Sequence, residues 1–179
     1  MPTLKEIKGR IASVQSTLKI TSAMKLVSSA KLRKAQTAIE AMRPYQERLS
    51  AMLELAAGAE NVAESTQNDD FPSGGTVVIA MASNSSLCGG FNAQVIAKTR
   101  EVLRQHPGAR VIAIGKKMSE AMRKGGVPRY GNLAPEALTA LSDHPSYSPV
   151  SEITDMLMTD PSVVCVLLVY NHFVSTGRQ

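Results

Sequence analysis

The sequence has 179 residues, of which 44% are apolar but only 4% aromatic, and it holds no tryptophan. This length fits one domain, with or without an extension, and so few aromatic side chains argue against a single large compact core. Residues 1–38 hold eight basic residues and one acidic residue, whereas the rest of the chain holds 12 basic and 14 acidic residues. The positive charge is therefore local and favours an acidic partner. The N-terminus lacks the apolar core of a signal peptide, and no apolar run reaches the roughly 18 residues that span a bilayer.

Apolar residues recur along the first third of the chain at alternating spacings of three and four. Twelve of the sixteen positions reached from Leu4 in this way are apolar. A heptad seam of this length predicts a long coiled-coil helix. Thr3 and Glu6 match a capping box at its start, and Gly58 is its expected stop. The seam is assigned to Leu4, Ile7, Ile11, Val14, Leu18, Leu32, Ile39 and Met42.

Two residues interrupt the helical pattern. Gly9 costs about 1 kcal/mol relative to alanine in a helix. Pro44 removes one backbone hydrogen bond and clashes with the carbonyl group of Glu40. The sequence therefore predicts a kink at Pro44 or a helix in two pieces.

Residues 19–36, KITSAMKLVSSAKLRKAQ, form a segment that we call the basic collar. It holds no acidic residue, and small residues separate its lysines and arginine. Three of the four polar seam positions, Thr21, Lys25 and Ser28, fall inside it. A second apolar stripe begins beside them at Ile20, so the apolar face turns around the helix. We infer that the collar meets something besides a coiled-coil partner.

The pattern changes after a polar, Gly- and Pro-containing linker at residues 59–75. Strands are predicted at 76–83, 109–115 and 162–175, and helices at 91–106, 116–126, 134–144 and 148–160, with Asn92 as a possible helix cap. Strands that alternate with helices indicate a parallel sheet. The predicted fold class is α/β: a long coiled-coil helix over 1–58 and a Rossmann-like three-layer domain with a mostly parallel sheet over 76–179, expected to be incomplete at its C-terminus.

The loop SNSSLCGGFN (83–92) joins a strand to a helix, where phosphate-binding loops lie. It is neither GxxxxGK[ST] nor GxGxxG, so a glycine turn that packs the helix on the sheet is the favoured interpretation. Cys88 has no histidine in a recognisable triad motif. Cys88 and Cys165 lack metal-ligand spacing and are expected to be buried thiols. We therefore predict no catalytic, cofactor-binding or metal-binding residues.

Three segments resemble, in order, the gamma subunit of F-type ATP synthases, the central stalk of the rotary motor. They are IKGRIASVQSTLKITSAMKLVSSAKLRKAQ (7–36), RPY (43–45) and SNSSLCGGFN (83–92). The resemblance implies that the long helix pairs with a C-terminal helix as an antiparallel coiled coil inside a hexamer of alpha and beta subunits. It also implies that the α/β domain, at the foot of the stalk, meets the epsilon subunit and the membrane rotor ring.

The function implied by this resemblance is that of a non-catalytic rotor subunit without a cofactor. Its rotation would couple proton or sodium translocation to ATP synthesis, with no nucleic-acid partner and no direct membrane insertion. Its expected location is peripheral, on the cytoplasmic side of a bacterial plasma membrane. A nucleic-acid-binding coiled-coil protein and a small α/β enzyme that uses the Gly89–Gly90 loop stay open as alternatives.

Several positions depart from the family pattern. The second long helix and its AMDNA-type signature have no counterpart in the printed sequence, which we expect to be truncated before them. Asn84 and Ser85 stand where the family commonly has Asp and Arg, and Ser22 replaces the usual basic residue before AMK.

By analogy with the family, the collar supplies the contacts to an acidic lever on the beta subunit and to the bore of the hexamer. The predicted contact residues are Met24, Lys25, Lys31, Arg33 and Lys34. Small residues would give the shaft a smooth surface, and positive charge would give an attraction that tolerates changes of angle.

Overall fold

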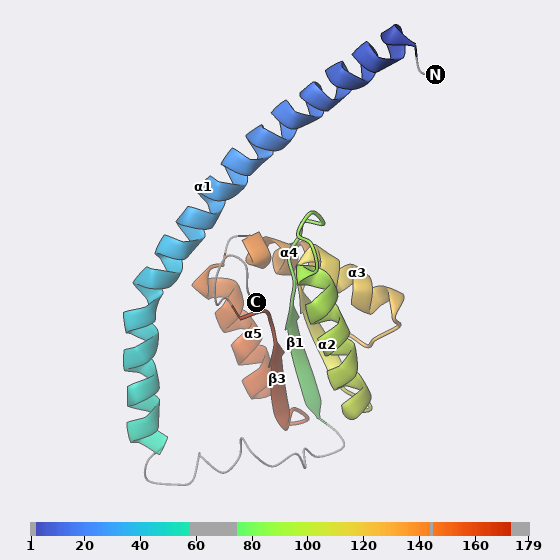
Figure 1. The fold of residues 1–179 in the computed structure, drawn as a ribbon. Helices are drawn as coiled ribbons and strands as arrows, with labels where there is room; N and C mark the ends of the chain where they lie inside the picture. The colour runs from blue at the N-terminus through green and yellow to red at the C-terminus, as the bar shows by residue number, and fades with distance from the viewer. Residues whose placement is uncertain (1–2, 58–74, 144, 173–179) are drawn as a thin grey trace. The chain divides into compact units, whose positions relative to one another are not determined.

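The computed structural model describes residues 3–57, 75–143 and 145–172. The chain divides into two compact units, Met1–Gln67 and Asn68–Gln179. The described part of the first unit is helix α1, and that of the second holds strands β1–β3 and helices α2–α5 (Figure 1).

Helix α1 runs from Leu4 to Ala57. Its first turn is closed by the predicted capping box. The backbone N–H of Thr3 donates to Glu6 Oε2 at 2.9 Å, and the backbone N–H of Glu6 donates to Thr3 Oγ1 at 3.3 Å. These bonds satisfy two of the donors that every helix leaves free at its start. The predicted stop at Gly58 lies outside the described residues.

Pro44 lies inside α1, and the helix continues on both sides of it. Of the two predicted alternatives, a helix in two pieces is therefore excluded, and a continuous helix is what the structure has. Figure 1 shows one helix, whose C-terminal part bends away from the direction of the rest. Pro44 removes a single hydrogen bond from a helix of 54 residues, and the Ala, Met, Glu and Arg residues around it favour helix strongly enough to continue the ladder.

The second unit contains a parallel sheet with the strand order β2-β1-β3. Its strands are β1 (Thr76–Met81), β2 (Arg110–Ile114) and β3 (Cys165–Val169). Its helices are α2 (Phe91–Gln105), α3 (Lys116–Lys124), α4 (Pro135–Asp143) and α5 (Tyr147–Thr159). In the register, Val78 of β1 lies between Val111 of β2 and Leu167 of β3.

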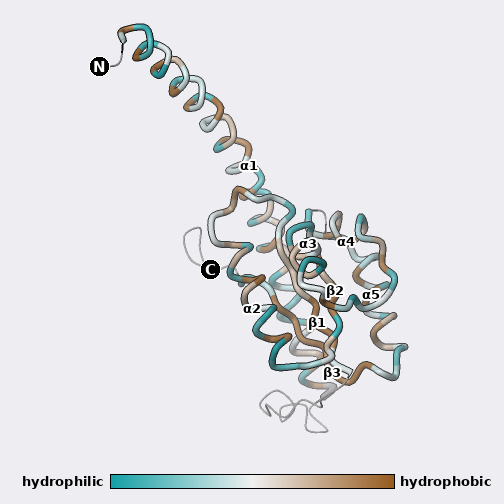
Figure 2. The backbone as a smooth tube through the Cα atoms, turned by 90° about the vertical axis from the view of Figure 1, so that its right-hand side faces the viewer, coloured by the Kyte–Doolittle hydropathy of each residue, from teal (hydrophilic) through white to brown (hydrophobic). Residues whose placement is uncertain are grey.

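Helices cover both faces of this sheet. Side chains alternate along β1, so Val78 and Ala80 pack with residues of α2 and α3, whereas Val77 and Ile79 pack with residues of α4 and α5. Figure 2 shows the strands as hydrophobic backbone between helices of mixed hydropathy. The structure therefore has the predicted three-layer α/β architecture, and all pairs among its described strands are parallel.

Two local predictions are wrong. The strand predicted over 162–175 is limited to β3, because β1 supplies pairing partners only for Cys165–Val169; residues 173–175 lie outside the described part. Asn92 is not the cap of α2, since Gly90 holds that position. Asn92 is the second residue of α2, and its side chain bonds back to the preceding loop.

Candidate functional site

The five predicted contact residues of the basic collar all lie on α1 with exposed side chains: Met24, Lys25, Lys31, Arg33 and Lys34. No ion pair within the described residues involves α1, because the three that occur there all belong to the α/β unit. The collar therefore presents its positive charge without compensation from its own helix. An acidic surface would meet unpaired cations here.

The collar charges do not share one face of the helix. At about 100° per residue, Arg33, Lys34 and Lys31 lie about 80°, 180° and 240° around the axis from Lys25. A partner that docks on one side could therefore contact only some of them. A partner that surrounds the helix could contact them all, so this distribution favours an encircling acidic surface.

Three threonine hydroxyls of α1 are satisfied within the helix. Thr17 Oγ1 donates to the carbonyl group of Ser13 at 3.0 Å, Thr21 Oγ1 to that of Thr17 at 2.9 Å, and Thr37 Oγ1 to that of Arg33 at 3.1 Å. Such back-bonding uses the hydroxyl hydrogen locally. The hydroxyl hydrogen of Thr21 inside the collar, and those of Thr17 and Thr37 on either side of it, are therefore already used within the helix.

The heptad seam of α1 is uncovered in the described structure. Its eight assigned residues range from 39% exposed at Leu32 to 71% exposed at Leu4. An apolar stripe of this extent marks a surface that binds another element. The coiled-coil pairing itself stays a prediction, supported by the spacing and by this exposure.

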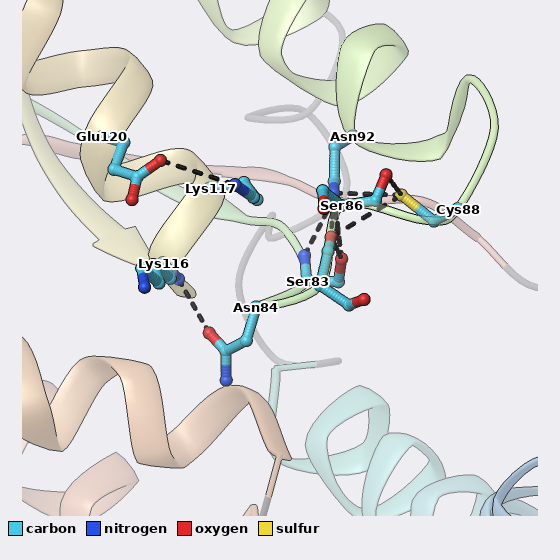
Figure 3. Close-up of polar contacts among 9 residues, drawn as sticks. Ser83, Asn84, Ser86, Cys88, Asn92, Lys116, Lys117 and Glu120 are labelled. Atoms are coloured by element: carbon cyan, nitrogen blue, oxygen red, sulfur yellow. Dashed lines mark hydrogen bonds and ion pairs between the residues drawn. The ribbon is translucent and has the colours of Figure 1, made fainter. Parts of the chain in front are cut away.

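The loop between β1 and α2 is organised by Asn92. Its amide nitrogen lies 2.8 Å from the carbonyl oxygen of Ser85 and 3.1 Å from the sulfur of Cys88, and its Oδ1 accepts from the backbone N–H of Ser83 at 3.0 Å. Figure 3 shows these bonds meeting at Asn92. The predicted glycine turn is therefore also held by an asparagine that folds the loop onto the first turn of α2.

Cys88 lies in this loop, half-buried rather than fully buried as expected. Its sulfur contacts the Asn92 amide, at 3.1 Å, and the carbonyl oxygens of Ser85 and Ser86, at 3.8 and 3.9 Å. None of these partners is a general base, so the geometry does not activate the thiol as a nucleophile. Cys165 is also half-buried, and burial raises the pKa of its thiol.

Asn84 joins three elements at the carboxyl end of the sheet. Its Nδ2 donates to the carbonyl oxygen of Thr139 in α4 at 2.9 Å. Its Oδ1 accepts from the backbone N–H of Lys116, the first residue of α3, at 2.8 Å, and Figure 3 shows this second bond. Sequence reasoning found the departure from Asp at this position but not its role. The partners lie 32 and 55 residues away, so no local pattern could reveal them.

Helix α4 also bonds to the ends of β1 and β2. Ser142 Oγ donates to the carbonyl oxygen of Ala82 at 3.0 Å, and the backbone N–H of Gly115 donates to the carbonyl oxygen of Leu138 at 3.2 Å. Nucleotides bind open α/β sheets in the crevice at this edge. In this protein, the polar groups described at this end of the sheet and in the loop between β1 and α2 bond to one another. This arrangement does not favour the alternative of a nucleotide-binding enzyme that uses Gly89–Gly90.

A second polar cluster lies at the opposite end of β2, and sequence reasoning missed it. The hydroxyl of Tyr130 bonds to Asp160 Oδ2 at 3.0 Å, and the Arg110 guanidinium lies 4.7 Å from the centre of the Tyr130 ring. Burial and the bond to Asp160 raise the pKa of Tyr130. Hydrogen bonds from Ser162 lower the pKa of Asp160. This cluster ties the end of α5 to the sheet and has no open reactive group.

Within residues 3–57, 75–143 and 145–172, no three His, Cys, Asp or Glu residues gather where a metal ion could be held. In the same part of the chain, no helix is both long and apolar enough to cross a bilayer.

Comparison with known proteins assigns the chain to a family. A family model described as ATP synthase matches residues 3–179. Since this match spans nearly the whole chain, the chain belongs to this ATP synthase family.

The similar curated proteins are gamma chains. The ATP synthase gamma chain of Bacteroides fragilis is 40% identical over 187 residues, an alignment that covers 100% of this chain and 63% of the relative. Those of Flavobacterium johnsoniae and Rhodospirillum rubrum are 38% and 37% identical, with 63% and 62% of each relative covered. The chain thus spans a little under two thirds of the length of these relatives.

Proposed function

We propose that this chain is the rotor, or central-stalk, subunit of an F-type ATP synthase. It carries no catalytic site of its own. Its rotation inside a hexamer of alpha and beta subunits couples proton or sodium translocation to ATP synthesis. The α/β unit provides the foot of the stalk, which meets the epsilon subunit and the membrane rotor ring. The complex lies on the cytoplasmic side of a bacterial plasma membrane, with this subunit peripheral.

The observation that carries the proposal is the arrangement of charge around α1. Unpaired cations point in several directions from one exposed helix, and a hexamer with an acidic bore is a partner that can reach all of them. The family match and the gamma-chain relatives support the same assignment. The uncovered seam supports pairing with a second long helix, as the family resemblance implies.

The distribution of charge also suggests how torque is transmitted. A shaft that docked tightly at one angle would be trapped there. Coulomb attraction to an acidic lever weakens only gradually with distance and direction, whereas hydrogen bonds are lost below an angle of about 120°. The collar attracts the hexamer through exposed cations, and the hydroxyl hydrogen of Thr21 is already used within the helix, so this attraction tolerates rotation.

Neutralisation of the collar tests the proposal. We expect the triple variant Lys25→Gln, Lys31→Gln, Lys34→Gln to assemble into the ATP synthase complex but to lower ATP-driven proton pumping in membrane vesicles several-fold. The matched control is Lys5→Gln, Lys8→Gln, Arg10→Gln, which removes the same charge from the same helix outside the collar and should pump normally. Normal pumping by an assembled collar variant would refute the charge argument.

A further inference from the structure

A groove of about 980 Å³ lies along the outer edge of β2, between α3 and α4. Buried apolar residues line its floor, among them Val111, Met122 and Leu138. Its volume lies at the upper end of the range typical of small-molecule sites. The collar contacts proposed above lie on α1 and do not involve this groove.

The floor of the groove contains an unpaired backbone donor and acceptor. In β2, Ile112 and Ile114 face β1, since the Ile114 carbonyl accepts from Ala82, so the N–H and C=O of Ala113 face outward. Ala113 is 8% exposed, and within the described residues neither of these groups has a hydrogen-bond partner. Both groups therefore face the groove at the edge of the sheet, where they are available to a ligand.

The neighbouring outward groups of β2 are already occupied. The N–H of Val111 donates to Pro128 at 2.9 Å, its carbonyl accepts from Tyr130 at 3.0 Å, and the N–H of Gly115 donates to Leu138 at 3.2 Å. The open position is therefore one residue wide and closed at both ends. An added β-strand needs several consecutive free groups, so this position favours a compact ligand.

The walls of the groove favour a flat ligand. A ring that bonds to a strand edge lies near the plane of the sheet. One of its faces would meet Met122 and Val127 from the α3 side, and the other would meet Leu138 from α4. Methionine sulfur and aliphatic carbon both pack well against aromatic rings.

The rim of the groove carries charges of both signs: Lys116, Arg123 and Arg129, with Glu120, Glu136 and Asp143. Three cations and three anions give no net preference for a charged ligand. A neutral ring with a donor beside an acceptor matches the site best.

We propose that this groove binds a neutral adenine-type base through the backbone of Ala113. Ring nitrogen N1 accepts from the Ala113 N–H, and the exocyclic amino group donates to the Ala113 carbonyl. The base lies between Met122 and Leu138. No covalent step is involved.

The probe is adenosine, titrated into the full chain labelled with ¹⁵N and followed by NMR. Binding should shift the Ala113 amide resonance and slow its hydrogen exchange. Purine riboside, which lacks the amino group, leaves the Ala113 carbonyl unpaired and should bind about tenfold more weakly. Unchanged Ala113 signals at millimolar adenosine, or equal binding of the two nucleosides, would overturn the proposal.

A variant that fills the groove provides a second test of the proposal. Ser119 is half-buried and lines the groove, so Ser119→Phe should abolish the adenosine response while the remaining resonances keep their dispersion. Lys124→Phe, on the exposed end of the same helix, is the control and should keep the response. A response that survives in Ser119→Phe would contradict binding in this groove, and if that variant does not fold, the comparison of the two nucleosides decides.

Discussion

Asn84 shows how one side chain can organise the end of a sheet. Its amide supplies a donor and an acceptor at once, and the structure uses both, toward Thr139 and Lys116. An aspartate keeps the acceptor for the start of α3, where a negative charge is favourable. It has no donor for Thr139, so its second oxygen would face a carbonyl oxygen. The amide therefore suits this loop better than an aspartate would.

The stability of variants at Asn84 should follow the number of hydrogen bonds that each substituted side chain retains. We expect Asn84→Ala to lower the free energy of unfolding by about 1–2 kcal/mol, because it removes a partly buried bond to Thr139 and an exposed bond to Lys116, and Asn84→Asp to lower it less. Urea unfolding followed by circular dichroism measures both. Asn132→Ala, at an exposed position, is the control. Equal stability of Asn84→Ala and the unmodified chain would show that these bonds contribute nothing.

Asp160 should contribute to the acid sensitivity of the α/β unit. Hydrogen bonds from Ser162 hold the pKa of this carboxyl below its ordinary value of 3.8. A carboxyl with a lowered pKa stabilises the fold above its unfolded-state pKa and loses that contribution as the pH falls through the folded-state value. Stability should therefore decline below about pH 4.

The matching variant is Asp160→Asn, which cannot ionise. Its unfolding free energy should fall less steeply over the same acidic range than that of the unmodified chain, measured by urea unfolding at a series of pH values. Glu152→Gln, exposed on α5, should leave the slope unchanged. Parallel curves for Asp160→Asn and the unmodified chain would contradict this assignment.

At the scale of elements, the regular features were predictable and the long-range contacts were not. The capping box, the helical period of α1 and the apolar runs of β1 and β2 are local patterns, so they appear in the sequence. The end of β3 depends on the length of β1. The continuity of α1 through Pro44 depends on whether the helix propensity of the neighbouring residues outweighs the hydrogen bond that proline removes. The bonds of Asn84 and Tyr130 span 26 or more residues, so no local pattern contains them.

The turn from β2 to α3 is the tightest of these junctions. Gly115 has φ +90°, and a Cβ there would overlap the carbonyl oxygen of Ala82. We expect Gly115→Ala to destabilise the α/β unit by about 3 kcal/mol or more, because it combines backbone strain with displacement of β1. Thermal unfolding measures the loss.

Gly9 in α1 provides the opposite case. Nothing lies within 4 Å of a Cβ built there. Gly9→Ala should therefore raise the stability of the helix by about 0.5–1 kcal/mol, seen as higher helical content by circular dichroism. A loss of helix in Gly9→Ala would mean that something does approach this glycine closely.

At the scale of the whole molecule, an encircling partner makes a distinctive prediction. Lys25 and Lys34 point about 180° apart on α1. If the hexamer surrounds the collar, Lys25→Glu and Lys34→Glu should lower ATP-driven proton pumping to similar extents in the assembled complex. Lys5→Glu, outside the collar, is the control. A defect in only one of the two collar variants would indicate a partner that docks on a single face.

The threonine hydroxyls that bond back along α1 bear on the speed of such a motor. A helix joined to a surrounding hexamer by direct hydrogen bonds would have to break those bonds at every step of its rotation. Each such bond, at a net value of about 1 kcal/mol, would slow a step by about fivefold. Because Thr17, Thr21 and Thr37 donate to carbonyl groups of their own helix, these three hydroxyls would add no such bonds if α1 turns inside the proposed hexamer.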